Sequence, residues 1–154
     1  MKKIIILMVA VLVAVSALAA DVFTGEEQPE FLTVISAQSG AFGGETVTLE
    51  GVSTAVYFSD RPERIAGHMG VSDFAALWDK GDDSFFADPP NATLSILEDG
   101  GITNIVLVLT DASVTGESVT FKVDILEGDL PEEFGAASLF VDAFPTSVNN
   151  QITD

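Results

Sequence analysis

Short segments in which apolar and polar residues alternate recur through most of this 154-residue chain, and they restrict the folds that it can adopt. The clearest is Ser118–Ile125, in which every second residue is apolar. Successive side chains of a β-strand point to opposite faces, so this alternation predicts a half-buried strand. Thr46–Glu50 shows the same pattern, whereas Ile105–Leu109 is apolar throughout and predicts a central strand covered on both faces.

Seven segments have this pattern or a high β-propensity, and strand follows strand with turn residues such as Asp99-Gly100 between them. Strands without long helices between them pair mainly in antiparallel fashion. We therefore expect a mainly β domain, an antiparallel two-sheet sandwich of immunoglobulin-like or related topology, with one short helix in an insertion. An open barrel is the alternative. The predicted strands are 31–35, 46–50, 54–58, 93–97, 105–109, 118–125 and 137–141.

The N-terminus is typical of a secretory signal peptide, with two lysines before an apolar run at residues 4–15. Small residues at Ala17 and Ala19 predict cleavage after Ala19. An uncleaved anchor is the weaker alternative, because the run is shorter than the ~20 residues that span a bilayer. Residues 1–19 are therefore predicted to be a signal peptide. The mature chain, 20–154, is expected to have no membrane span and to be secreted or periplasmic.

The composition divides the predicted mature chain into three parts. Residues 20–30 are rich in Gly, Glu and Pro and are expected to form a flexible leader. Residues 31–145 contain all the predicted strands and are expected to form a single domain, and 146–154 form a polar tail. The chain has no cysteine, so core packing, a metal or a partner must stabilise it in place of disulfides.

Acidic residues dominate the charge of this chain, with 24 Asp and Glu against six Lys and Arg and a formal net charge of −18. Cleavage after residue 19 removes Lys2 and Lys3, which leaves four cations against 24 acids and a net charge of −20. We expect no nucleic-acid partner, because phosphate binding needs cations. Adaptation to a salty medium, which screens the repulsion, and binding of divalent cations such as calcium are the two explanations left open.

Residues 57–91 interrupt the strand pattern and hold the only Tyr, His and Trp, together with three of the four cations of the predicted mature chain. Loops on a rigid β-scaffold commonly carry function, so a ligand site is expected here. The candidate ligand-binding residues are Tyr57, Asp60, Arg61, Arg64 and His68.

The arginine pair in this group suits an anion. A guanidinium group matches a carboxylate, sulfate or phosphate with two parallel hydrogen bonds. His68 can donate a hydrogen bond or take up a proton beside it. The alternative is internal: Arg61 and Arg64 pair with acids on neighbouring loops.

The same segment contains the one helical pattern, predicted over 72–80 with Ser72 as the N-cap. Its apolar residues share one face, so Phe74 and Trp78 are expected to pack against the sheet. Gly81 is predicted to end the helix.

Four aspartates at and after the end of this helix form a second candidate cluster. Calcium takes six to eight oxygen ligands, often from carboxylates on one loop, but the spacing here does not match the EF-hand loop. A solvated acidic loop is the alternative. No cofactor is predicted, and calcium is the one metal that this cluster suggests. The candidate metal ligands are Asp79, Asp82, Asp83 and Asp88.

Three parts of this region, the run YFSDRPER at 57–64, a helix ending in Trp78 and the run DPPNA at 88–92, resemble a group of small secreted proteins of marine and other bacteria. No activity is assigned to that group. The resemblance implies only that the segment is the recognisable core of the group, and it brings no site residues.

The sequence contains none of the common nucleophile-elbow, phosphate-loop, dinucleotide or zinc-protease motifs. A non-catalytic binding or accessory protein is therefore favoured over an enzyme, with 57–91 as its recognition surface and a small anionic ligand or a protein as its partner. One alternative is a structural or cell-surface interaction domain, stabilised by calcium. The other is a small enzyme that acts on an anionic substrate through Asp60, Arg61, Arg64 and His68. The oligomeric state is left open.

Overall fold

The computed structural model describes residues 30–79 and 81–142. The predicted signal peptide, the predicted leader up to residue 29 and the predicted tail lie outside these residues, as does Lys80. The predicted domain is described as far as Asp142.

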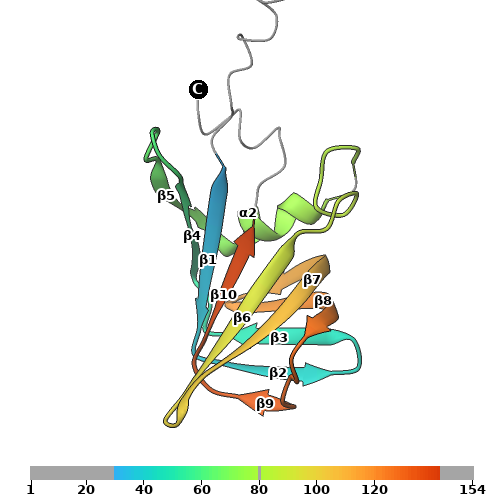
Figure 1. Ribbon diagram of the computed structural model, residues 1–154. Coiled ribbons are helices and arrows are strands. Elements are labelled where there is room, and N and C mark those ends of the chain that lie inside the picture. Colours follow the sequence, from blue (N-terminus) through green and yellow to red (C-terminus); the bar gives the residue numbers. More distant parts are fainter. Residues whose placement is uncertain (1–29, 80, 143–154) are drawn as a thin grey trace, which may run out of the picture.

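Within the described residues, ten strands form one hydrogen-bonded sheet in the order β5-β4-β1-β10-β6-β7-β8-β3-β2-β9 (Figure 1). Every pair of neighbours is antiparallel, which confirms the predicted mainly β, antiparallel class. The division into two sheets is not confirmed, because all the strands belong to a single hydrogen-bonded order. The strands are β1 (Phe31–Ala37), β2 (Ser39–Gly43), β3 (Thr46–Glu50), β4 (Thr54–Ser59), β5 (Ala66–Gly70), β6 (Asn91–Glu98), β7 (Gly101–Thr115), β8 (Ser118–Glu127), β9 (Glu133–Phe134) and β10 (Ala137–Asp142).

The sheet is bent, and its two halves enclose a common core. One half contains β5, β4, β1, β10 and β6, and the other contains β3, β2 and β9. In Figure 1, β1, β10 and β6 run steeply, whereas β2, β3 and β9 run across the view. The chain passes between the halves at β1–β2, where only Gln38 separates the strands, and again from β9 to β10. The β7–β8 pair joins the halves and has register shifts at Val106/Leu107 and Leu109/Asp111. Such irregularities bend and twist a strand pair, which lets one long sheet fold over.

Alternate residues of the strands fill the space between the halves, as their patterns predict. Val119 and Phe121 of β8 are almost completely buried. Ile125, which the same alternation places inward, is 40% exposed, because it lies beside the register shift in the β7–β8 pair. In the predicted central strand, Ile105 and Leu107 are buried, but the intervening residues are only half-buried on the outer face. Residues 105–109 are therefore covered on one face, and the prediction that both faces are covered is wrong.

Three strands, β2, β5 and β9, have no counterpart in the sequence-based prediction. β2 and β5 each contain two glycines and no β-branched residue, so their β-propensity is low. β9 has only two residues, which are too few to show a pattern. Hydrogen bonds to β3, β4 and β2 hold them in place instead. The predicted strands 31–35 and 105–109 are correspondingly too short, since β1 runs to Ala37 and β7 to Thr115.

The segment between β5 and β6 closes one end of the core. It begins with the helix α2 (Val71–Ala75) and the 3₁₀ helix η1 (Ala76–Trp78), and α2 packs against β4, β5 and β7. Trp78 meets Phe74 and Phe121 edge-on, with ring centroids 5.3 and 5.7 Å apart. The prediction that Phe74 and Trp78 pack against the sheet is confirmed, since both are buried.

The ends of this helical segment differ from the prediction. The N-cap is Gly70, not Ser72, because β5 leads directly into the helix. The helical residues end at Trp78, and Asp79 rather than Gly81 follows as the C-cap. No helix within the described residues has the length and apolar composition needed to cross a membrane.

The core holds one polar side chain whose replacement should stabilise the protein. Thr33 is completely buried, and its Oγ1 has no hydrogen-bond partner among the described residues. A buried hydroxyl without a partner costs about 1–3 kcal/mol. We expect Thr33→Val to raise the free energy of unfolding in urea by about 1 kcal/mol. Thr48→Val is the control and should lower it, because the Thr48 and Thr120 hydroxyls form a 3.0 Å hydrogen bond. A loss of stability in Thr33→Val would mean that its hydroxyl has a partner in solution.

Candidate functional site

The predicted ligand-binding residues lie on or beside one hairpin, formed by β4 and β5. Its strands pair Tyr57 with Gly67 and Val56 with His68. The prediction of an uninterrupted non-strand insertion at 57–91 is therefore wrong for 66–70, where an edge strand replaces the expected loop.

Hydrogen bonds hold the tip of this hairpin in a defined conformation. The Ser59 amide donates to the Ile65 carbonyl at 2.8 Å, and the Ile65 amide donates to the Ser59 Oγ at 2.8 Å. The Arg64 amide donates to the Asp60 carbonyl at 3.1 Å. Arg64 adopts a left-handed φ of 52°, and the Arg61-Pro62 peptide bond is cis. The three hydrogen bonds define the backbone from which the tip presents its side chains.

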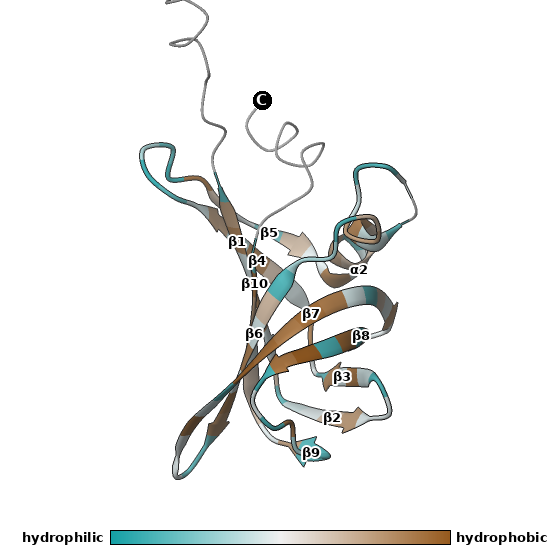
Figure 2. Cartoon of the chain, turned by 45° about the vertical axis from the view of Figure 1, so that its right-hand side comes forward, coloured by the Kyte–Doolittle hydropathy of each residue, from teal (hydrophilic) through white to brown (hydrophobic). Residues whose placement is uncertain are grey.

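Both arginines at this tip are exposed. The alternative to ligand binding predicts that Arg61 and Arg64 form ion pairs with acids on neighbouring loops. Within residues 30–79 and 81–142 no ion pair of Arg61 or Arg64 is present, although Asp60 and Glu63 flank them in sequence. Figure 2 shows the hydrophilic tip projecting away from the hydrophobic strands. The two guanidinium groups are therefore accessible to a ligand.

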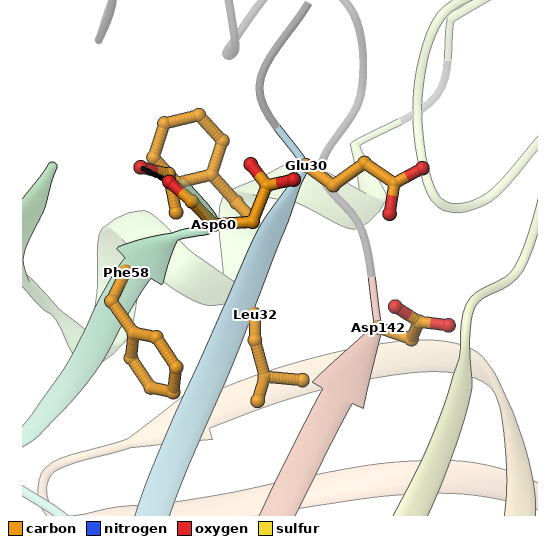
Figure 3. A pocket seen from close by; sticks show the side chains of 7 residues that line it. Glu30, Leu32, Phe58, Asp60 and Asp142 are labelled. Atoms are coloured by element: carbon orange, nitrogen blue, oxygen red, sulfur yellow. Dashed lines mark hydrogen bonds between the residues drawn. The ribbon is translucent and has the colours of Figure 1, made fainter. Parts of the chain in front are cut away.

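Asp60 belongs to a different group from the arginines. Its amide donates to the Glu30 carbonyl at 3.2 Å, which ties the start of the tip to the beginning of β1. Asp60, Glu30 and Asp142 line a hollow of about 200 Å³ together with Leu32 and Phe58 (Figure 3). The structure thus places Asp60 at an acidic rim on the outer face of the sheet.

Tyr57 points to the opposite face of β4 and has a structural role. Its ring meets Phe31 edge-on with centroids 6.0 Å apart, and it packs against the core. The ring also lies directly over Gly67, where a Cβ atom would come within 2.6 Å of the Tyr57 Cζ. Tyr57 therefore orients β5 against β4 rather than facing a ligand at the tip.

His68 is exposed on β5, opposite Val56. It lies four residues beyond Arg64, which at ~3.3 Å per residue separates their Cα atoms by up to about 13 Å. The five predicted residues are therefore divided among the tip, the outer face and the core side of the hairpin. Only Arg61 and Arg64 remain as neighbours in one exposed turn.

The predicted metal ligands lie in the exposed loop after η1. Asp79, Asp82, Asp83 and Asp88 are all exposed. Ser84 orders this loop: its Oγ donates to the Gly81 carbonyl at 3.0 Å and accepts from the Ala87 amide at 3.3 Å.

Phe85 anchors the same loop to the core. Its amide donates to the Leu77 carbonyl at 2.8 Å, and its buried ring packs on Trp78 with centroids 4.8 Å apart. Nowhere in the described part of the chain do three or more His, Asp or Glu side chains lie together in a way that could hold a metal ion. Calcium binding by this loop thus stays a prediction.

The outer face of the sheet was not identified from the sequence. Its hollows involve Leu32, Phe140 and Asp142, which lie in strands correctly predicted from their apolar runs. In a run such as Leu139-Phe140-Val141, however, the pattern does not show which apolar residue faces out. Register with the neighbouring strands decides this, and register is not readable from one strand.

Comparisons of this chain with protein-family models, with curated proteins and with solved structures find no match.

Proposed function

We propose that this protein is an exported, non-catalytic binding domain that holds an anionic group of its ligand at the tip of the β4–β5 hairpin. Export rests on the predicted signal peptide at 1–19, which would place the mature chain in the periplasm or outside the cell. Binding rests on one observation. Arg61 and Arg64 are exposed on a hydrogen-bonded turn and have no ion pair with any described residue, in a chain with 24 acids and six bases.

The chemistry of the two side chains defines the ligand class. Each guanidinium group offers a planar fork of donors that fits a carboxylate, sulfate or phosphate. The strongly negative charge of the rest of the chain opposes the approach of a free anion. We therefore expect millimolar affinity for a small anion, and tighter binding only when the anionic group belongs to a larger ligand or a protein surface.

The arrangement favours binding over catalysis. A Ser-His-Asp triad for an anionic substrate would need His68 beside the arginines, and a phenol acid or base would need Tyr57 there. His68 lies along β5 from the tip, and Tyr57 packs on Phe31 on the other side of the hairpin. The arginines can hold an anionic group, but neither the imidazole nor the phenol of this segment lies beside them, and the acids that flank them in sequence are Asp60 and Glu63.

Thermal unfolding of the mature chain in phosphate and in sodium chloride of equal ionic strength tests this proposal. A ligand at ten times its Kd stabilises the folded state by about 1.4 kcal/mol, which is about 5 °C for a domain of this size. We expect this rise in the wild-type protein and its loss in the double variant Arg61→Ala/Arg64→Ala.

Lys122→Ala is the matched control, because Lys122 is exposed on β8, away from the hairpin. It should keep the full phosphate effect. An equal rise in the wild type and the double variant would contradict anion binding at the tip, since phosphate also stabilises proteins nonspecifically.

A further inference from the structure

The outer face of β4, β1, β10, β6 and β7 carries a band of mainly apolar residues. Cross-strand partners share one face of a sheet, so the register defines the band. Val34 lies opposite Val56 and Phe140, and Phe140 continues through Thr93 to Val106.

A second row runs beside the first, with Leu32 opposite both Phe58 and Asp142. Beyond the first row, on the other side, the face becomes polar, with Ser95 donating to the Asn104 Oδ1 at 2.6 Å. The band therefore has defined limits.

These apolar side chains face solvent in the described structure. Val56, Phe58 and Phe140 are 38, 40 and 37% exposed, and Leu32 and Val34 are half-buried. Isolated exposed apolar residues are ordinary, but a contiguous band rimmed by polar residues marks an interaction surface.

Two neighbouring hollows mark the band. One, of about 200 Å³, lies beside Phe58, and the other, of about 260 Å³, lies beside Phe140 and Val106. Leu32 and Asp142 line both hollows. Each is smaller than the ~300–1,000 Å³ typical of small-molecule pockets, and each suits a single apolar side chain of a partner.

The charged residues that line the hollows are all acidic. Glu30 and Asp60 lie above the Phe58 and Leu32 side chains at the first hollow, and Asp142 lies to the right of Leu32 (Figure 3). No Lys, Arg or His is among the described residues that line either hollow. A complementary partner must therefore combine apolar side chains with positive charge.

The negative charge of these residues argues against three other occupants: a second copy of the chain, an anionic membrane and another segment of the same chain. A second copy of the chain would add further carboxylates to the same interface, and anionic membranes are repelled in the same way. The remaining segments of the predicted mature chain do not fit either. Residues 143–154 contain no Lys or Arg, and residues 20–29 contain three acids and no base.

From this complementarity we propose that the outer face docks a cationic amphipathic segment of another protein. Apolar side chains of that segment occupy the two hollows, and its Lys or Arg side chains pair with Glu30, Asp60 and Asp142. This surface goes beyond the anion-binding tip, because it is built from different residues and selects the opposite charge.

Binding of a synthetic peptide of alternating Leu and Lys tests the proposal. Four strand spacings of about 4.8 Å separate β4 from β7, so a peptide about eight residues long spans the band. At 0.15 M salt we expect saturable binding to the mature chain with a Kd of about 10–100 µM. An equally long Gly-Lys peptide and a Leu-Glu peptide should bind at least about tenfold more weakly.

Variants of the face locate the binding site. Phe58→Ser and Phe140→Ser should each weaken binding about tenfold, and Asp60→Asn/Asp142→Asn should reduce its salt dependence. Ile102→Ser and Glu98→Gln are the controls, because both residues lie on the β6–β7 hairpin beyond the polar row. They should bind within about twofold of wild type.

Three results would overturn the proposal. The Gly-Lys peptide could bind as tightly as the Leu-Lys peptide, which would show attraction by net charge alone. The control variants could lose as much affinity as the face variants. The mature chain could form a dimer that Phe140→Ser dissociates, which would assign the face to a second copy.

Discussion

Replacement of Trp78 by alanine is expected to lower the free energy of unfolding by about 3–5 kcal/mol, the largest effect of any single change considered for this protein. Trp78 is 3% exposed and contacts Phe74, Phe85 and Phe121, so its removal leaves a cavity where the helical segment meets the sheet. Its Nε1 also donates to the Leu109 carbonyl at 2.9 Å, a buried hydrogen bond that alanine cannot replace.

Urea unfolding of three variants separates these contributions. Trp78→Phe keeps most of the ring contacts and removes the donor, so we expect a smaller loss of about 1–3 kcal/mol. Phe86→Ala removes an aromatic ring that is 46% exposed in the same loop and should cost less than either Trp78 variant. If Trp78→Ala proved no more destabilising than Phe86→Ala, the helical segment would not close the core as described.

Replacement of Gly67 by alanine is expected to destabilise the protein by about 1–3 kcal/mol through overpacking. A Cβ atom at this position would lie 2.6 Å from Tyr57 Cζ, and the Tyr57 ring rests on Phe31 and the core. The ring or β5 must therefore move. Since β5 is an edge strand whose only neighbour in the described sheet is β4, we expect it to separate first.

Hydrogen exchange of the β5 amides, measured together with urea unfolding, tests this expectation. Gly43→Ala is the matched control, because Gly43 also lies in a strand, has no left-handed φ and has open space where the Cβ would be. It should be neutral or slightly stabilising. Unchanged exchange at His68 and Met69 in Gly67→Ala would contradict the role assigned to the Tyr57–Gly67 contact.

Seven strands were predictable, because side-chain alternation, an apolar run or a high β-propensity identifies each of them. Thr46–Glu50 is predicted to its last residue. The sequence could not reveal how strands far apart in the chain pair, so the continuous sheet that replaces two separate ones follows from register and from the bends at Gln38 and in β7.

The short strands show why local pattern has limits. Ala66–Gly70 reads as a loop because its glycines disfavour a strand. One of them, Gly67, is the residue that lets Tyr57 pack closely against β5. Gly67 therefore lowers the β-propensity of this segment and is also required for its close packing against Tyr57.

The sequence could bring together only part of the candidate site. The concentration of rare residue types directs attention to the β4–β5 hairpin, and Arg61 and Arg64 share its tip. Sequence proximity could not show that Tyr57 faces the core or that Asp60 joins Glu30 and Asp142, because strand alternation and cross-strand neighbours separate residues that are adjacent in the chain. The aspartates after η1 are likewise close in sequence without forming a described metal site.

Nuclear magnetic resonance of the arginine side chains tests the anion-binding tip most directly. The sequence contains only two arginines, so the Nε–Hε region should show two signals, one from Arg61 and one from Arg64. In a phosphate titration at constant ionic strength, we expect both signals to shift along the same saturable curve with a Kd of about 1–10 mM. Small linear shifts that sodium chloride reproduces would contradict the account, because the two guanidinium groups would then not form a common site.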